Sequence, residues 1–69
     1  MIDEILIDCL EVAGQIERRA FIRQVSEEFD LDPKEADDTL TSLIRMGKVR
    51  IFVNKKNHAI LELWESDRL

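Results

Sequence analysis

The stretch 30–51 constrains the fold more than any other part of the chain, because it contains both ends of one helix. At its start, Asp32 can cap free backbone N–H groups, Pro33 suits the first helical position, and Glu35 completes a capping box. At its end, Gly47 can adopt the left-handed conformation with which many helices stop. We therefore expect a helix bounded on both sides, followed by the first residues of a strand.

The helix expected over 33–46 has one apolar face and one polar face, repeating with the 3.6-residue period of an amphipathic helix. The apolar face comprises Ala36, Leu40, Leu43 and Ile44. The polar face comprises Lys34, Asp37, Asp38, Thr41, Ser42 and Arg45. One side of this helix should thus pack on a core, while the other meets solvent or a partner.

Two further helices are predicted over 2–13 and 18–29 from the same period. The first has an apolar stripe of Ile2, Ile5, Leu6, Cys9, Leu10 and Ala13, with Val12 beside it. The second has an apolar stripe of Phe21, Ile22, Val25 and Phe29. Gly14 ends the first helix and Asp30 takes the turn after the second, whereas Ile7 falls among acidic side chains and is expected at the surface.

After the third helix the apolar period changes to 2, which is typical of half-buried strands. One face of the two alternating runs comprises Val49, Ile51, Val53, Ala59, Leu61 and Leu63. The polar segment 54–58 between the runs predicts a hairpin over 48–64, and the short piece 15–17, with Ile16 inward, is a candidate edge strand beside it. We therefore expect a single domain over 1–69 of a mainly α, α+β class, a three-helix bundle with a small antiparallel β-hairpin.

The composition limits the chemistry that this chain of 69 residues can perform. The single cysteine, Cys9, excludes an internal disulfide framework, suits a reducing compartment, and is expected to be a small buried hydrophobe. No apolar run approaches the roughly 20 residues of a membrane span, and no signal segment is evident, so we expect a cytoplasmic location and no membrane partner. With one histidine, no tyrosine and no Gly-rich phosphate loop, we expect no enzyme, no cofactor and no metal site.

The order of these elements resembles the winged-helix branch of the helix-turn-helix proteins, over residues 2–64. The resemblance is carried by Gly14, Ile16, Phe21, Ile22, Val25, Leu31-Asp32-Pro33, Leu40, Leu43, Ile44 and Met46-Gly47-Lys48-Val49. Two features depart from the common form of this family. The second helix is longer, and the chain is acidic overall, with a formal net charge of −5.

In most winged-helix proteins the third helix enters the major groove of DNA, and the hairpin wing touches the backbone or the minor groove. The resemblance therefore implies a small protein that binds double-stranded DNA, a transcriptional regulator, with 33–46 in the major groove and the wing 54–58 on the backbone. The DNA-binding residues that it implies are Lys34, Thr41, Ser42, Arg45, Lys48, Arg50, Lys55, Lys56, Arg18 and Arg19.

The basic residues are concentrated in the segments that this interpretation needs. Residues 39–61 contain five basic residues and no acidic one, and residues 18–23 contain three arginines. Arg18 and Arg19 occupy an electrostatically unfavourable place at the start of a helix, which a docked phosphate would relieve.

Asp37 and Asp38 oppose the DNA interpretation, because carboxylates on the reading face repel phosphates. The alternative is an acidic winged-helix module that mediates protein–protein contact within a larger complex, with Ile7 and Phe52 as its apolar contacts. A homodimer through the helix 2–13 would double the contacts with DNA.

Overall fold

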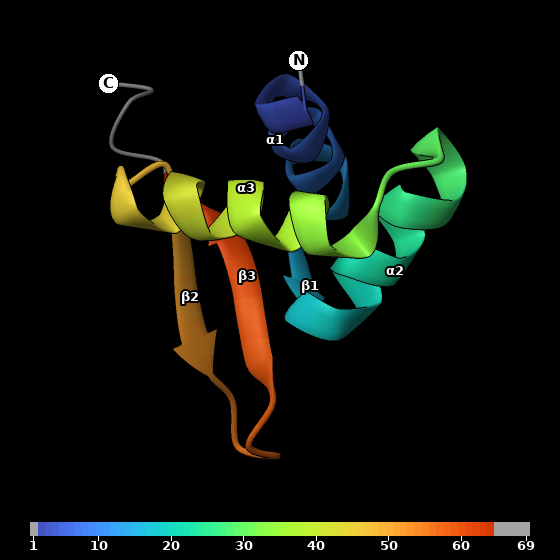
Figure 1. Cartoon of the computed structure of the whole chain (residues 1–69). Helices are drawn as coiled ribbons and strands as arrows, with labels where there is room; N and C mark the ends of the chain where they lie inside the picture. Colours follow the sequence, from blue (N-terminus) through green and yellow to red (C-terminus); the bar gives the residue numbers. More distant parts are fainter. Residues whose placement is uncertain (1, 65–69) are drawn as a thin grey trace.

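The computed structural model describes residues 2–64, which form three helices and a three-stranded antiparallel sheet (Figure 1). In chain order the elements are α1 (Ile2–Ala13), β1 (Gln15–Glu17), α2 (Arg18–Phe29), α3 (Pro33–Arg45), β2 (Val49–Val53) and β3 (Ala59–Leu63). The predicted mainly α, α+β fold class is confirmed, and the arrangement is consistent with a winged-helix layout. In that layout α2 and α3 form the helix-turn-helix pair, and the β2–β3 hairpin is the wing.

The start of α3 is fixed by the residues that precede it. Asp32 has an extended backbone, and its Oδ1 accepts a hydrogen bond from the Lys34 N–H at 3.2 Å. Pro33 occupies the first helical position, where its missing N–H removes no helical hydrogen bond. The predicted capping box is half formed, since within residues 2–64 Glu35 accepts no hydrogen bond from the Asp32 N–H. One side-chain cap therefore positions this end of the helix.

The end of α3 is a left-handed glycine turn. Gly47 has a φ of 79°, and its N–H donates to the Ile44 carbonyl at 3.1 Å. The next N–H, of Lys48, donates to the Leu43 carbonyl at 3.0 Å, which completes a Schellman motif. Met46 caps the helix, which thus stops one residue before the predicted end.

Two other left-handed residues end the first two helices. Asp30 has a φ of 54° and follows α2, so that the Leu31 N–H turns back to the Ser26 carbonyl at 3.0 Å. Gly14 has a φ of 77° and follows α1, with its N–H donating to the Leu10 carbonyl at 2.8 Å. Both positions were predicted, because glycine and aspartate tolerate this conformation better than most residues.

The strand order β1-β3-β2 places β3 in the middle of the sheet. Leu61 on β3 pairs with Ile16 on one side and with Ile51 on the other, and its side chain is fully buried. Ile51 and Val53 lie on the same face of the sheet, yet they are 37% and 63% exposed. The expected burial of β2 is therefore wrong beyond Val49, because the hairpin extends past the helices (Figure 1).

The core collects buried side chains from all three helices and from β2 and β3. Its members are Leu6, Leu10, Phe21, Val25, Ala36, Leu40, Leu43, Val49 and Leu61. Cys9 and Ile7 are partly buried and pack against this cluster. Ile7 was expected at the surface, but α1 contacts both α3 and the sheet, so that the buried side of α1 is wider than a single apolar stripe.

Two other predicted core residues lie at the edge of the bundle. Ala13 is exposed, and Phe29 is 41% exposed. Each is the last residue of its helix, where no neighbouring element covers it. Val12, next to Ala13, is 91% exposed. The predicted apolar stripes of α1 and α2 are therefore wrong at their C-terminal ends.

The packing of α3 predicts the effect of truncating its central leucine. Leu40 is fully buried, and we expect Leu40→Ala to lower the free energy of unfolding by about 2–5 kcal/mol. That loss is large for a small domain, whose total stability is usually about 5–15 kcal/mol. Urea unfolding followed by circular dichroism measures it. The exposed Val12→Ala is the control, with a change within about 0.5 kcal/mol; a loss below about 1 kcal/mol for Leu40→Ala would contradict this packing.

Candidate nucleic-acid interface

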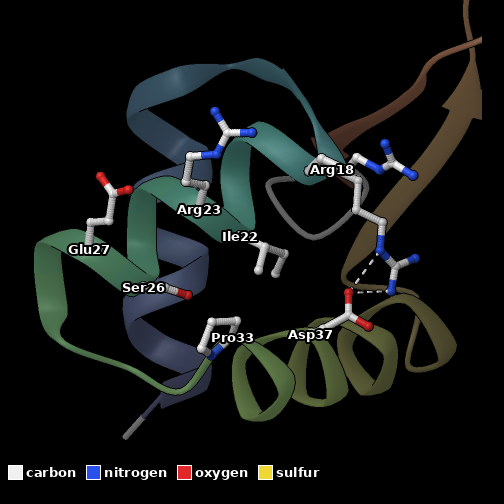
Figure 2. Close-up of a pocket in the computed structure, with 8 residues that line it drawn as sticks. Arg18, Ile22, Arg23, Ser26, Glu27, Pro33 and Asp37 are labelled. Carbon is white, nitrogen blue, oxygen red and sulfur yellow. Dashed lines mark hydrogen bonds and ion pairs between the residues drawn. The ribbon is translucent and has the colours of Figure 1, made fainter.

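Arg18 connects the first turn of α2 to the outward side of α3 (Figure 2). Its Nε and Nη2 donate to Asp37 Oδ1 at 3.1 and 2.9 Å, and Nη2 also donates to Thr41 Oγ1 at 3.0 Å. The Thr41 hydroxyl in turn donates to the Asp37 backbone carbonyl at 3.0 Å. Arg18 and Thr41, both predicted to contact DNA, are thus engaged with each other and with the acid that was expected to repel phosphates.

The second acid on this side of α3 also has a partner in its own helix. Lys34 Nζ lies 3.4 Å from Asp38 Oδ2, one turn apart on an exposed surface. Ser42 Oγ donates to the Asp38 backbone carbonyl at 3.3 Å. Lys34 and Ser42 remain exposed, so both can also meet a ligand. The charges of Asp37 and Asp38 are therefore each offset within the chain.

The remaining predicted cations on this part of the molecule differ from Arg18 and Lys34. Each is exposed, and none forms an ion pair with another residue of 2–64. This set, which we call the unpaired cations, comprises Arg19, Arg45, Lys48, Lys55 and Lys56.

Arg50 lies on the face of the sheet opposite the core. Its Nη1 is 3.5 Å from Glu62 Oε1, and Glu62 Oε2 accepts from Gln15 Nε2 at 2.8 Å. The guanidinium carbon lies 5.5 Å from the ring centroids of both Phe52 and Trp64, within the range of cation–π attraction. Arg50 was predicted to contact DNA, but its charge is already offset by Glu62, and its guanidinium plane already lies against Phe52 and Trp64.

The wing loop is held in a defined shape by one asparagine. Asn54 Oδ1 accepts from the N–H groups of Lys56 and His58 at 3.0 and 2.9 Å. The Asn54 N–H donates to the His58 carbonyl at 3.0 Å, and Asn57 adopts a φ of 65° at the tip. Lys55 and Lys56 are thus exposed on an ordered loop rather than on a loose one.

The loop of the wing adjoins the start of α2. His58 Nδ1 lies 3.1 Å from Glu17 Oε2, which joins the loop to the residue before α2. A hollow of about 410 Å³ is lined from one side by Arg19 and its neighbours and from the other by Asn57 and His58. The arginines of α2 and the wing therefore border the same part of the surface.

Sequence reasoning missed the residues that organise this surface. Asn54 and Glu17 position the wing, and Trp64 and Glu62 hold Arg50. The hairpin register contains the signal for Glu62, because Arg50 and Glu62 stand directly opposite each other. The contact with Glu17 has no comparable signal, since it depends on how β1 joins the sheet.

Cys9 does not form part of this interface. Burial raises the pKa of the Cys9 thiol, and the negative charges of Glu28 and Asp8 raise it further. Within residues 2–64 no cluster of histidine, cysteine, aspartate or glutamate side chains could hold a metal ion. The described residues thus offer neither an activated thiolate nor a metal centre at this position.

Comparison of the chain with models of protein families, with curated proteins and with solved structures found no match. None of the helices within residues 2–64 combines the length and the apolar character that crossing a membrane requires.

The contact between Arg18 and Asp37 predicts a measurable coupling between α2 and α3. A double-mutant cycle with Arg18→Ala and Asp37→Ala should give a coupling of about 0.5–1 kcal/mol, because the pair is partly exposed and screened by solvent. The same cycle on the exposed Lys34–Asp38 pair should give no more than about 0.5 kcal/mol. An absence of coupling between Arg18 and Asp37 would mean that Asp37 is not neutralised by Arg18.

The raised pKa of Cys9 predicts slow alkylation in the folded protein. At pH 8 iodoacetamide should modify the folded chain more slowly than the urea-unfolded chain, because only the thiolate reacts and the folded state disfavours it. Mass spectrometry of timed samples measures both rates. Faster reaction of the folded chain would show that the thiol is activated instead.

Proposed function

We propose that this chain is a small DNA-binding protein of the winged-helix type that acts as a transcriptional regulator. α3 would enter the major groove, and the wing 54–58 would lie on the DNA backbone. The observation that supports this proposal is the division of charge on the surface. The two acids on the outward side of α3 are offset within the chain, whereas the unpaired cations have no ion-pair partner among the described residues.

The unpaired cations lie where a bound duplex would meet phosphates. Arg45 and Lys48 flank the end of α3, Lys55 and Lys56 lie on the wing loop, and Arg19 lies at the start of α2 beside that loop. Lysine and arginine that neutralise phosphates release bound counterions, and this release drives most of the affinity for DNA. The interface therefore needs local positive charge more than a positive net charge.

Part of the negative charge of the chain lies on another helix. Asp3, Glu4 and Asp8 lie on α1, which packs against the inner side of α3 through Leu6 and Leu10. This separation reduces the repulsion that the net charge of −5 would otherwise impose on a bound duplex.

Base reading would depend on few side chains of α3. Thr41 already accepts from Arg18, so its hydroxyl has little capacity left for a base. Ser42 retains acceptor capacity, and Arg45 offers the planar set of donors that suits guanine. We therefore assign Arg45 the main base or phosphate contact and Arg18 the positioning of α3.

A second candidate, contact with another protein, is favoured by the outer face of the sheet. Trp64 is 46% exposed there, Phe52 and Ile60 are half-buried, and Arg50 lies against both aromatic rings. Exposed aromatic side chains next to arginine are common at protein interfaces. Lys48 adjoins this surface, because its carbonyl accepts from the Trp64 N–H at 3.0 Å. The other unpaired cations lie on α2, on α3 and in the wing loop, so one role does not exclude the other.

A homodimer through α1 would have a narrow apolar contact. Ile7 packs against the core, which leaves Val12 as the large apolar side chain of α1 that is well exposed. Whether bound as one copy or two, the proposed function requires no cofactor and no catalytic group.

The proposal predicts salt-dependent binding to duplex DNA. If three to five of the unpaired cations contact phosphates, affinity should fall roughly 40- to 500-fold between about 50 and 200 mM salt. Lys55→Gln with Lys56→Gln should reduce the slope of log affinity against log salt by about 2, since each phosphate contact contributes about 1. Fluorescence anisotropy with a labelled duplex measures both effects.

Arg23→Gln is the matched control, because it removes one exposed positive charge that is not among the predicted DNA contacts. It should leave the salt slope unchanged, and the wing variants should keep the melting temperature of the parent protein. An absence of binding at about 50 mM salt would refute the proposal. Equal effects of the wing variants and Arg23→Gln would refute the proposed position of the wing.

A further inference from the structure

A cavity of about 620 Å³ lies between α2 and α3 (Figure 2). Its volume falls within the range of roughly 300–1,000 Å³ that is usual for small-molecule sites. Its lining is mainly apolar, with Ile22 contributed by α2 and Pro33 by α3. Charged side chains from both helices surround this apolar floor. The cavity thus combines a surface for an apolar group with polar groups at its rim.

The rim of the cavity is more positive at one end than at the other when the ion pair within the chain is taken into account. Arg18 and Asp37 both line the cavity, but they neutralise each other. Arg19 and Arg23 lie one turn apart on α2, and neither forms an ion pair with another described residue. Glu27, a further turn along, contributes one negative charge at the far end. The end of the cavity near Arg19 is therefore positive and suited to an oxyanion.

One residue of the cavity wall, Ser26, has a buried hydroxyl group. Ser26 lines the same cavity, and its Oγ is buried with no hydrogen-bond partner in the described part of the chain. Figure 2 shows the Ser26 hydroxyl on the side of α2 that faces Pro33. The oxygen is closed off from the cavity as well as from other polar groups, so it offers no hydrogen bond to a ligand in this conformation.

We propose that this cavity binds a small organic anion. Its carboxylate or phosphate head contacts Arg19 and Arg23, and its apolar body lies on Ile22 and Pro33. Arginine suits the head because its planar donors match the geometry of both oxyanions. This site does not depend on the proposed DNA binding, and it is tested without DNA.

Three probes separate the parts of the proposed ligand in an NMR titration of the full chain. 4-Phenylbutyrate carries the head and the body, 4-phenylbutan-1-ol carries only the body, and inorganic phosphate carries only the head. We expect saturable shifts of the α2 amides around Ile22 and Ser26 with the acid, and binding at least about tenfold weaker for the other two probes. Equal binding of the alcohol would show that the arginines are not used, and equal binding of phosphate that the apolar floor is not used. Either result, or an absence of shifts with the acid, would overturn the proposal.

Matched variants exclude a general effect of charge. Arg23→Gln should weaken binding of 4-phenylbutyrate about tenfold, whereas Lys56→Gln, which removes the same charge from the wing, should not change it. Ser26→Ala removes a hydroxyl that is closed off from the cavity, so it should leave the binding of 4-phenylbutyrate unchanged while the melting temperature of the free protein stays the same or rises. Equal weakening by Arg23→Gln and Lys56→Gln would assign the effect to long-range electrostatics and refute the site.

Discussion

The burial of one side of α3 is the constraint on which the rest of the structure depends. Ala36, Leu40 and Leu43 are buried against side chains from α1, α2 and the sheet. Because this side packs in the core, the helical period places Lys34, Asp38 and their neighbours on the opposite side, at the surface. The caps at both ends then fix how far the exposed side extends. The outward side of α3 is thus determined by what its inner side packs against.

The chain has an acidic composition and yet carries exposed cations around α3 and the wing. Several of the acidic residues near these cations form ion pairs within the chain. On α3, Asp37 is bound by Arg18 and Asp38 lies beside Lys34. On the sheet, Glu62 is bound by Arg50, and at the wing Glu17 meets His58. Exposed pairs of this kind contribute little to stability. Their consequence is electrostatic, because they offset the acids nearest to the unpaired cations. At the start of α3, by contrast, the exposed Asp32 and Glu35 form no ion pair with another described residue.

Much of the fold could be predicted because its signals are local. The caps of α3, the left-handed Asp30 and the change of period after Gly47 each depend on a few adjacent residues. Burial was less predictable, because it depends on what covers a side chain. Phe29 is exposed because its helix ends there, and Val53 because the hairpin outreaches the helices.

The candidate interface could be predicted in position but not in detail. The exposed positions of α3 and the wing follow from the period of the sequence, and five of the ten predicted residues are exposed cations without a described ion-pair partner. The pairing of Arg18 with Asp37 joins residues on different helices and depends on the angle at which α2 meets α3. Local patterns contain no information about that angle, so the neutralisation of Asp37 appears only in three dimensions.

The most direct test of this account is an NMR titration of the labelled chain with a short DNA duplex at low salt. The account predicts amide shifts along the outward side of α3, at the start of α2 near Arg19 and in the wing loop 54–58, with little change on α1 or at Phe52 and Ile60 on the outer face of the sheet. Shifts confined to the sheet face around Trp64, or no shifts at all, would contradict it.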